Sequence, residues 1–440
     1  MDKFLPRKRQ KYLADGEIDN STEYKLTILQ SLYPHLEPDV LLDLLAAHNG
    51  SLSLTTSTLS NPTPLKCTAI NGHQTSLSSY LISTSSPSKI HKASFRKGKT
   101  VHLYCPEDVA AHTPCTIIHN FLAADEANSL LIELLEESTT FEKNTFKLFD
   151  NVVKSPHTAC FYVNDHEEVI RQKTKYYYNG KLLSVSLARL GTFKDIRQHT
   201  PQMLQISPKI AASVNTEVSR RIKTYPNGLK LHHQSPKPWC PNAAFVNCYN
   251  GPSESVGYHS DQLTYIGPRA IIGSLSLGVS REFRLRKISL RESGSESKTE
   301  SGKLMESDGQ ISIHLPHNSL LVMHAEMQEE WKHCIAPASA IDFHPISGSK
   351  RINITYRDYR ASLHPRYTPV CRCHIPMLLR TVQQQKNNLG RYFWMCQSAS
   401  IPGMESCGDF QWAEFDKDGE PVWNDNKKDQ RPSDAKELQN

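Results

Sequence analysis

Apolar and polar residues alternate along short runs in the second half of the chain, and this period of two predicts β-strands. The clearest run is RINITYR at 351–357, where two isoleucines and a tyrosine alternate with four polar residues. Successive side chains of a strand point to opposite faces, so Arg351, Asn353, Thr355 and Arg357 should share one face while the isoleucines enter an apolar core. Further strands are predicted at 242–249, 270–278, 282–290, 311–315 and 319–324.

Helical spacing of apolar residues predicts helices at 124–138 and 207–225. Many short strands preceded by packed helices favour an α+β class, with a double-sheet barrel or jelly roll over residues 111–362 and helices supporting it. Residues 21–62 predict a small helical module in which one helix stops at Gly50.

Segments without hydrophobic periodicity separate these regions. Residues 1–20 form a basic tail, the Ser/Thr/Pro-rich residues 63–110 predict a disordered linker, and residues 417–440 predict a disordered tail. A polar low-complexity loop, RESGSESKTESGKLMESD at 291–308, lies between two of the predicted strands.

Composition narrows the class of protein. The chain has 440 residues, 38% hydrophobic and 22% charged, with a net charge of +6, which is compatible with a nucleic-acid partner. No apolar run is long enough for a membrane span, and the N-terminus lacks the apolar stretch of a signal peptide. Four of the eleven cysteines fall within 371–407, which favours a metal site in a reducing compartment over a disulfide framework.

His259 and Asp261 are the only His-x-Asp pair in the chain. On an extended segment these side chains share a face and can hold one cation, and His333 is a candidate third ligand. Two histidines and one carboxylate leave positions open on a metal, as in non-haem Fe(II) oxygenases. An isolated His-x-Asp is usually structural, so the surrounding spacing decides.

That spacing resembles the AlkB family of 2-oxoglutarate- and Fe(II)-dependent dioxygenases. Asn247-x-Tyr249 lies twelve residues before His259, and the Arg-x-Asn-x-Thr-x-Arg run follows the distal histidine. The resemblance implies a double-stranded β-helix, or jelly roll, as the dioxygenase core. It also implies iron ligands at His259, Asp261 and His333, and 2-oxoglutarate contacts from Asn247, Tyr249, Arg351, Asn353 and Arg357.

The implied reaction is oxidative demethylation of N-alkylated bases, of the 1-methyladenine and 3-methylcytosine type, in DNA, with release of formaldehyde and succinate. Two arginines on one strand face suit a dicarboxylate, because each guanidinium grips a carboxylate with a two-pronged fork. The alternatives are a dioxygenase of the same fold that acts on RNA or on a protein, and a non-catalytic adaptor for ubiquitin and DNA.

Residues 145–165 stand where the resembled family carries its base-flipping and lid elements. Such a base must leave the stack and be held by flat side chains. The candidate substrate contacts are His157, Phe161, Tyr162, Tyr178 and, on the substrate side of the sheet, Arg281. Each of these side chains alone is also explained by ordinary packing.

Residues 368–416 resemble the GRF zinc finger, with Gly390, Arg391, Tyr392 and Phe393 as the naming motif. Four thiolates suit a closed structural zinc site, and the expected ligands are Cys371, Cys373, Cys396 and Cys407, with His374 as the alternative to Cys373. By resemblance the finger binds single-stranded nucleic acid. We expect a tether outside the active site, built from Arg391, Phe393 and Trp412.

The N-terminal module resembles a CUE or UBA-like domain, which implies ubiquitin binding; a plain helical hairpin is the alternative. Residues 3–7 resemble a short sliding-clamp-binding motif, although Pro6 occupies an aliphatic position. The basic run at 7–11 suits a nuclear import signal or a solvated tail. A nuclear location is therefore expected.

Overall fold

The computed structural model describes residues 100–148, 151–178, 181–183, 196–288 and 309–423, and isolated positions between 29 and 56. The chain forms two compact units, residues 1–90 and 91–440. In the first unit Leu29, Leu41 and Leu45 are helical and buried. The basic tail, most of the linker, the loop at 291–308 and the end of the C-terminal tail lie outside the described residues.

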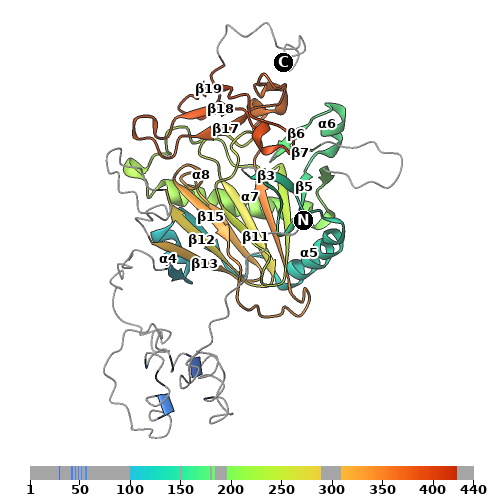
Figure 1. Ribbon diagram of the computed structural model, residues 1–440, viewed down its shortest axis with the longest axis vertical. Coiled ribbons are helices and arrows are strands. Elements are labelled where there is room, and N and C mark those ends of the chain that lie inside the picture. Colours follow the sequence, from blue (N-terminus) through green and yellow to red (C-terminus); the bar gives the residue numbers. More distant parts are fainter. Residues whose placement is uncertain are drawn as a thin grey trace, which may run out of the picture. The chain divides into compact units, whose positions relative to one another are not determined.

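Two β-sheets form the centre of the second unit (Figure 1). The five-stranded sheet has the order β1 (Thr100–Leu103), β13 (Gln310–Leu315), β12 (Arg281–Lys287), β15 (Trp331–Ile335) and β10 (Val256–His259). The seven-stranded sheet has the order β2 (Cys115–Ile118), β14 (Ser319–Met323), β11 (Ile272–Gly278), β16 (Lys350–Arg357), β9 (Ala243–Asn250), β5 (Thr158–Val163) and β8 (Ile196–Gln198). Side chains from both sheets share one hydrophobic cluster, so the sheets enclose a common core.

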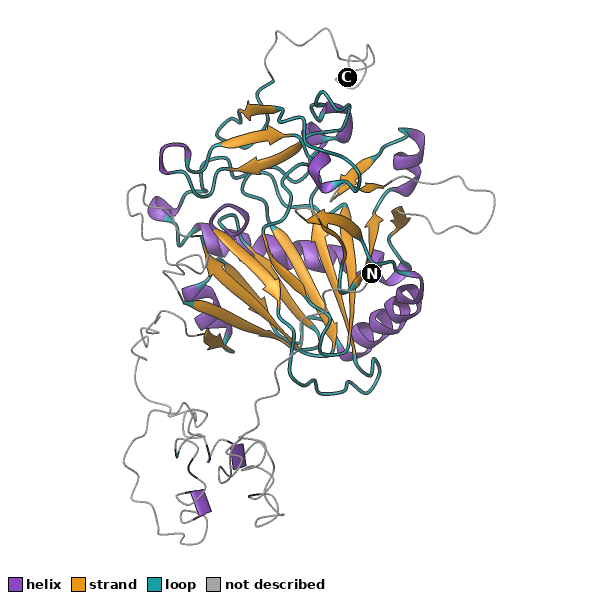
Figure 2. Cartoon of the chain, in the orientation of Figure 1, coloured by secondary structure: helices purple, strands orange, loops and turns teal. Residues whose placement is uncertain are grey.

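Helices support the outer face of the seven-stranded sheet (Figure 2). Helix α5 (Ala124–Glu137) and helix α7 (Pro201–Ile222) pack their apolar stripes against Ile352 and Ile354 of β16. The predicted alternation of β16 is therefore confirmed. Shorter helices are α4 (Pro106–His112), α6 (His166–Arg171) and α8 (Met327–Glu330). No helix in the described part of the chain is both long and apolar enough to cross a membrane.

Two hairpins stand at one end of the sheets. One pairs β3 (Thr145–Leu148) with β4 (Asn151–Lys154), within the segment predicted as a lid. The other pairs β6 (Tyr176–Tyr178) with β7 (Lys181–Leu183). Figure 1 shows both hairpins at the same end as the small third sheet.

That third sheet has the order β17 (Leu378–Thr381), β18 (Tyr392–Met395) and β19 (Phe410–Ala413). Its inner side joins the barrel core, because Leu379, Tyr392 and Trp394 belong to the same hydrophobic cluster as the two large sheets. The Tyr392 hydroxyl donates to Glu329 Oε1 at 3.0 Å, which closes the contact with a buried hydrogen bond. The predicted finger is thus packed on the barrel.

The predicted boundary of the linker at residue 110 is wrong. Residues 100–103 form β1, which pairs in parallel with β13, and residues 106–112 form α4 beside β2. A strand of four residues is too short to give a periodic signal, and its pairing partner lies some two hundred residues away in the sequence.

The predicted start of the disordered tail at residue 417 is also wrong. Residues up to 423 are described, and Gly419 has φ 76° in a turn whose backbone N–H groups reach the Asp416 carboxylate. The turn holds the chain against the barrel: His233 N donates to Lys417 O at 3.0 Å, and Arg360 Nη1 donates to Gly419 O at 2.6 Å.

Candidate functional site

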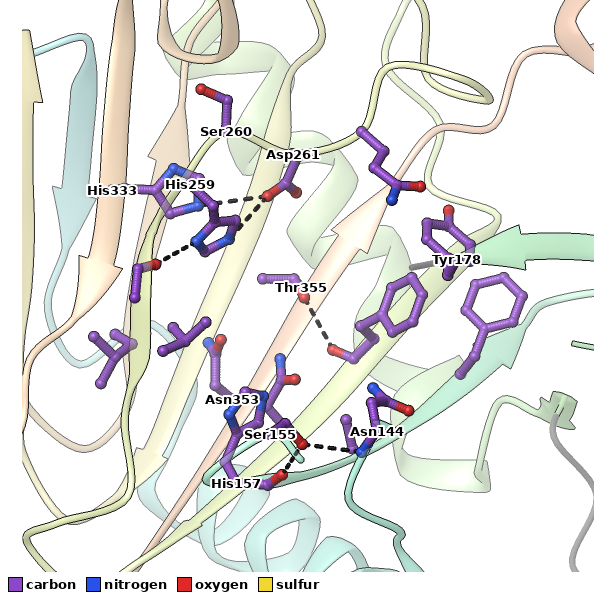
Figure 3. Close-up of a pocket in the computed structure, with 18 of the residues that line it drawn as sticks. Asn144, Ser155, His157, Tyr178, His259, Ser260, Asp261, His333, Asn353 and Thr355 are labelled. Carbon is purple, nitrogen blue, oxygen red and sulfur yellow. Dashed lines mark hydrogen bonds and ion pairs between the residues drawn. The ribbon is translucent and has the colours of Figure 1, made fainter. Parts of the chain in front are cut away.

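Strand pairing places the two predicted histidine ligands side by side. Strands β10 and β15 are antiparallel neighbours with His259 directly opposite His333, and the ring centroids lie 4.3 Å apart. Asp261 follows β10 by two residues, and its Oδ1 lies 3.5 Å from His259 Nε2 and 3.4 Å from His333 Nε2. Figure 3 shows both rings turned toward this carboxylate.

Hydrogen bonds and an ion pair from the surrounding residues orient this group. The His259 Nδ1 faces the Gly257 carbonyl at 2.8 Å, which leaves Nε2 directed at Asp261. Asp261 Oδ2 accepts from Arg357 Nη2 at 2.6 Å, and Asp261 N donates to Gln328 Oε1. Burial alone would raise the pKa of Asp261, but Arg357 and the two histidines hold that pKa well below its usual range.

Three candidate ligand atoms, two imidazole nitrogens and one carboxylate oxygen, therefore converge on one point. These atoms all lie within 4.8 Å of one another, and Oδ1 of Asp261 remains available because Arg357 occupies Oδ2. Two imidazole nitrogens and one carboxylate oxygen on one side of a cation suit Fe(II) with open positions opposite. The residues present fit the metal that the fold implies.

Arg351 lies at the deep end of the same pocket. Its side chain is 0% exposed, and its Nη2 donates to Ser276 Oγ at 2.8 Å. Among the described residues, its Nε and Nη1 have no hydrogen-bond partner. Burial lowers the pKa of Arg351 to about 10, so the guanidinium stays charged at neutral pH. A buried cation with two unused donors fits a carboxylate.

The other residues of the predicted cosubstrate set come from cross-strand pairs of β9 and β16. Tyr249 lies opposite Arg351 and Asn247 lies opposite Asn353. The Arg351 guanidinium sits 5.3 Å from the Tyr249 ring centroid, and Asn353 Nδ2 donates to Ser274 Oγ and to Leu275 O. All four line the pocket with Arg357. The set predicted from the sequence is brought together in one place.

The pocket has a volume of about 660 Å³ and carries aromatic rings on another side. Phe161, Tyr178 and Phe245 line it, and Tyr359 and Tyr265 back them in one ring cluster. Two of the predicted substrate contacts, Phe161 and Tyr178, thus face the pocket. Phe245 was missed, although it alternates with Asn247 and Tyr249 along the predicted strand 242–249.

His157 lines the pocket at the cosubstrate end. Its ring stacks on Tyr249 with centroids 4.7 Å apart, and its Nδ1 lies 3.1 Å from Ser255 O. Burial lowers the pKa of His157, which favours the neutral form of the ring. Figure 3 places it beside Asn353, below the candidate iron ligands His259, Asp261 and His333.

Two predicted substrate contacts are wrong. Tyr162 points to the opposite face of β5, where it is fully buried and donates to Glu137 Oε2 at 2.7 Å. Arg281 is 3% exposed and donates to four backbone carbonyls: Gly251 O, Pro252 O, Glu254 O and Ala336 O. Neither side chain lines the pocket.

The four finger cysteines converge as the sequence predicted. Ligand atoms of Cys371, Cys373, Cys396 and Cys407 lie within 4.8 Å of one another, and His374 is not in the group. Four thiols with no open position suit a structural Zn²⁺.

The finger also lines the pocket, which the sequence did not indicate. Leu379, Arg380, Thr381 and Gln383 belong to the lining. Gln383 Nε2 donates to Ser260 Oγ at 3.2 Å and to Gln328 O at 3.1 Å. Ser260 lies between two of the candidate iron ligands. The finger therefore borders the candidate active site, whereas the sequence led us to expect it outside that site.

The predicted tether residues stay outside the pocket, on the outer side of the finger. Arg391 stacks over Trp412, with 3.9 Å from its guanidinium carbon to the ring centroid. Phe393 lies directly opposite Trp412 on the neighbouring strand.

Comparison with known families agrees with these features. The model of the 2OG-Fe(II) oxygenase superfamily matches residues 114–357, the GRF zinc finger matches 369–416, and the CUE domain matches 25–61. The solved structure of OsALKBH1 is 14% identical, with a TM-score of 0.35, and covers 56% of this chain and 97% of its own.

Two curated relatives are similar over part of the dioxygenase region. The DNA oxidative demethylase ALKBH2 of Arabidopsis thaliana is 33% identical over 122 residues, which is 26% of this chain and 37% of the relative. The alpha-ketoglutarate-dependent dioxygenase alkB homolog 3 of Homo sapiens is 32% identical over 117 residues, 26% and 36% of the two chains. The matched part is thus about a third of each relative's length.

The expected α+β fold, the finger and the CUE module are confirmed by these matches, the first of which covers more than half of the chain. Together with the two-sheet core and its converging histidines and carboxylate, they show that the chain belongs to the 2OG-Fe(II) oxygenase superfamily.

Proposed function

We propose that the chain demethylates N-alkylated bases of the 1-methyladenine and 3-methylcytosine type in DNA, using Fe(II), O₂ and 2-oxoglutarate. The observation that carries this proposal is the order of chemistry within one pocket. A buried arginine with two unused donors lies deep, the His259–Asp261–His333 group lies near it, and aromatic rings line another side.

In this proposal Arg351 binds the distal carboxylate of 2-oxoglutarate through Nε and Nη1. A carboxylate can replace the water that those donors lose on burial, because among the described residues neither Nε nor Nη1 has a hydrogen-bond partner. Tyr249 covers the guanidinium from one side and restricts the direction from which the carboxylate enters.

Arg357 has a different role. It is already bonded to Asp261, so it orients that ligand and lowers the pKa of the carboxyl, which keeps Oδ1 ionised for the metal. Its Nη1 also donates to Thr355 Oγ1 at 3.1 Å, which fixes the guanidinium plane. His259, Asp261 and His333 would hold the iron.

Bound Fe(II) supplies the oxidising chemistry: 2-oxoglutarate and O₂ give succinate and CO₂ while the N-methyl group is hydroxylated, and the hydroxymethyl adduct releases formaldehyde. The chain excludes water and orients the methyl group. Phe161, Tyr178 and Phe245 provide flat apolar surfaces of the kind that hold a base taken out of its stack.

We also propose a zinc ion on the four finger thiols, a nuclear location, and ubiquitin as a partner of the CUE module. The thiol convergence supports zinc, and a DNA substrate supports the location. The clamp-binding resemblance at residues 3–7 lies outside the described residues and stays a prediction.

The test is formaldehyde release from a panel of oligonucleotides that carry one methylated base each. The panel includes 1-methyladenine and 3-methylcytosine in deoxy and ribo strands, with Asp261→Ala as the inactive control. We expect release from deoxy strands that depends on 2-oxoglutarate. Release only from ribo strands would replace DNA by RNA, and release from none would reject the demethylase.

A further inference from the structure

The dioxygenase pocket is closed on one side by the zinc finger. Strand β17 contributes Leu379, Arg380 and Thr381 to the lining, and Leu379 N donates to Thr264 Oγ1 at 3.2 Å. Gln383 reaches the loop between His259 and Asp261 through Ser260. The finger is therefore built into the site.

Arg380 differs from the other finger residues in the lining. Arg380 borders the pocket but is exposed, and among the described residues its side chain has no hydrogen-bond or ion-pair partner. The surrounding protein lowers the pKa of its guanidinium by desolvation, and no described carboxylate offsets this. A cation held beside a pocket without a protein anion is suited to an anion of the substrate.

Cross-strand pairing puts Arg380 at the start of a longer surface. Arg380 lies opposite Phe393, and Phe393 lies opposite Trp412, so the three side chains share one face of the finger sheet. Phe410 packs edge-on to Trp412 at 5.0 Å and is 51% exposed, while Trp412 is 39% exposed. Arg391 caps the Trp412 ring.

The β3–β4 hairpin bounds the pocket elsewhere. Phe146 of β3 and the preceding Asn144 line the pocket, and β3 contacts the short helix η7 (Ser398–Ser400) of the finger. A nucleic-acid strand with one base in the pocket can therefore run along the hairpin or along the finger, since both border the pocket. The finger face combines three flat rings with two guanidinium groups, whereas the described part of the hairpin carries one ring, Phe146, with Lys147, Lys154 and the exposed aliphatic Val152.

We propose that Arg380 positions the substrate by holding the phosphate next to the base in the pocket, and that the neighbouring bases of the same single strand stack on Phe393, Phe410 and Trp412. This inference deepens the proposed function and rests on it. It replaces the expected remote tether by a wall of the active site that selects strands over free nucleosides. Rings stack on any base, so the surface is tolerant of sequence.

The test compares Arg380→Ala with Arg220→Ala, which removes the same charge from an exposed position of α7 outside the pocket. The substrates are a methylated trinucleotide and the corresponding methylated nucleoside, which has no phosphate. For Arg380→Ala we expect KM for the trinucleotide to rise about tenfold, with kcat and the KM for 2-oxoglutarate unchanged, since one charge-assisted contact is lost.

The nucleoside should be used equally by wild type and variant, and Arg380→Lys should recover part of the loss. In direct binding of a single-stranded oligonucleotide, the slope of log affinity against log salt should fall by about 0.7 in Arg380→Ala. Trp412→Ala should weaken a strand of about twelve nucleotides more than the trinucleotide.

Equal KM values for Arg380→Ala and wild type on the trinucleotide would overturn the inference, as would the same rise with the nucleoside or with Arg220→Ala. If wild type demethylates strands and Arg380→Ala does so equally well, only this inference fails. If wild type releases no formaldehyde from any methylated strand, the proposed function fails and takes the inference with it.

Discussion

Arg351 and Arg357 are residues of the same type on one strand face, but they have different roles. The period of two placed both on the pocket side, and that prediction is confirmed by the lining. Their partners depend on the three-dimensional fold: Arg357 donates to Asp261, whereas Arg351 donates to Ser276 and has two further donors without a partner among the described residues. No spacing along the chain carries that difference.

Arg351→Ala should weaken 2-oxoglutarate binding by on the order of 2–5 kcal/mol, because the cosubstrate carboxylate would be buried without its cation. The measurement is calorimetric titration of 2-oxoglutarate into Mn²⁺-loaded protein, which needs no turnover. Lys350→Ala on the same strand is the matched control. An unchanged affinity would mean that Arg351 serves only the sheet.

Arg281→Ala should lower the free energy of unfolding by about 2–4 kcal/mol, since several buried carbonyls lose their donor. The KM for a methylated strand should not change per folded molecule. Urea unfolding and steady-state kinetics on the same preparation distinguish a structural role of Arg281 from a role in substrate binding. A raised KM at wild-type stability would restore the substrate contact that the sequence suggested.

Phe161 and Tyr162 show what the sequence alone can and cannot decide. They are neighbours on β5, so alternation allows only one of them to face the pocket, and both cannot be substrate contacts. The strand period gives this exclusion, but it does not say which of the two faces inward. That choice depends on β9, which pairs with β5 and brings Phe245 opposite Phe161.

At the scale of elements, the strands with strong alternation were predictable and the short ones were not. Strands β9, β11, β13, β14 and β16 lie within one or two residues of their predicted ranges. Strand β1 and the Gly419 turn gain their order from partners far along the chain, namely β13 and the loop at His233. Short segments of this kind carry too little pattern to be recognised in isolation.

The contact of β18 with α8 predicts a pH dependence of stability. Burial raises the pKa of Glu329, although Arg269 and Tyr392 partly oppose this. Its folded pKa lies above the unfolded value near 4.3, so its favourable contribution is complete below that value and is lost as pH rises through the folded pKa.

Glu329→Gln keeps an acceptor for the Tyr392 hydroxyl and removes the titration. The unfolding free energy of wild type minus that of the variant should therefore fall as pH rises from about 4 to 8, and it should be flat if burial does not perturb Glu329. Urea unfolding at a series of pH values gives the difference directly. Glu330→Gln, on the adjacent more exposed side chain, is the control.

At the scale of the molecule, the barrel and the finger share one hydrophobic cluster. Residues 91–440 also form one compact unit. The sequence suggested separate domains joined by a short linker, because each part carries its own motif. The barrel and the finger pack together through apolar side chains from each part. The apolar character of a side chain alone does not show which residues it contacts.

Loss of zinc should therefore lower the stability of the whole unit and not release the finger alone. For Cys396→Ser we expect one thermal transition with a lower midpoint, and reduced turnover even on a trinucleotide. Cys105→Ser, at an exposed cysteine outside the thiol group, should match wild type. Two transitions, with the upper one at the wild-type midpoint, would show that the finger folds separately.

The contact between Gln383 and Ser260 links the candidate iron ligands to the finger, which carries four converging thiols. Alkylating agents that methylate base nitrogens also attack thiolates, which are the reactive form of cysteine. On the proposed function, a reagent that methylates the substrate base can also methylate the four thiols of the finger, none of which lines the pocket. Extensive alkylation would then inactivate the protein when its proposed substrate is most abundant. The affinity of zinc for these thiolates would set the dose at which inactivation occurs.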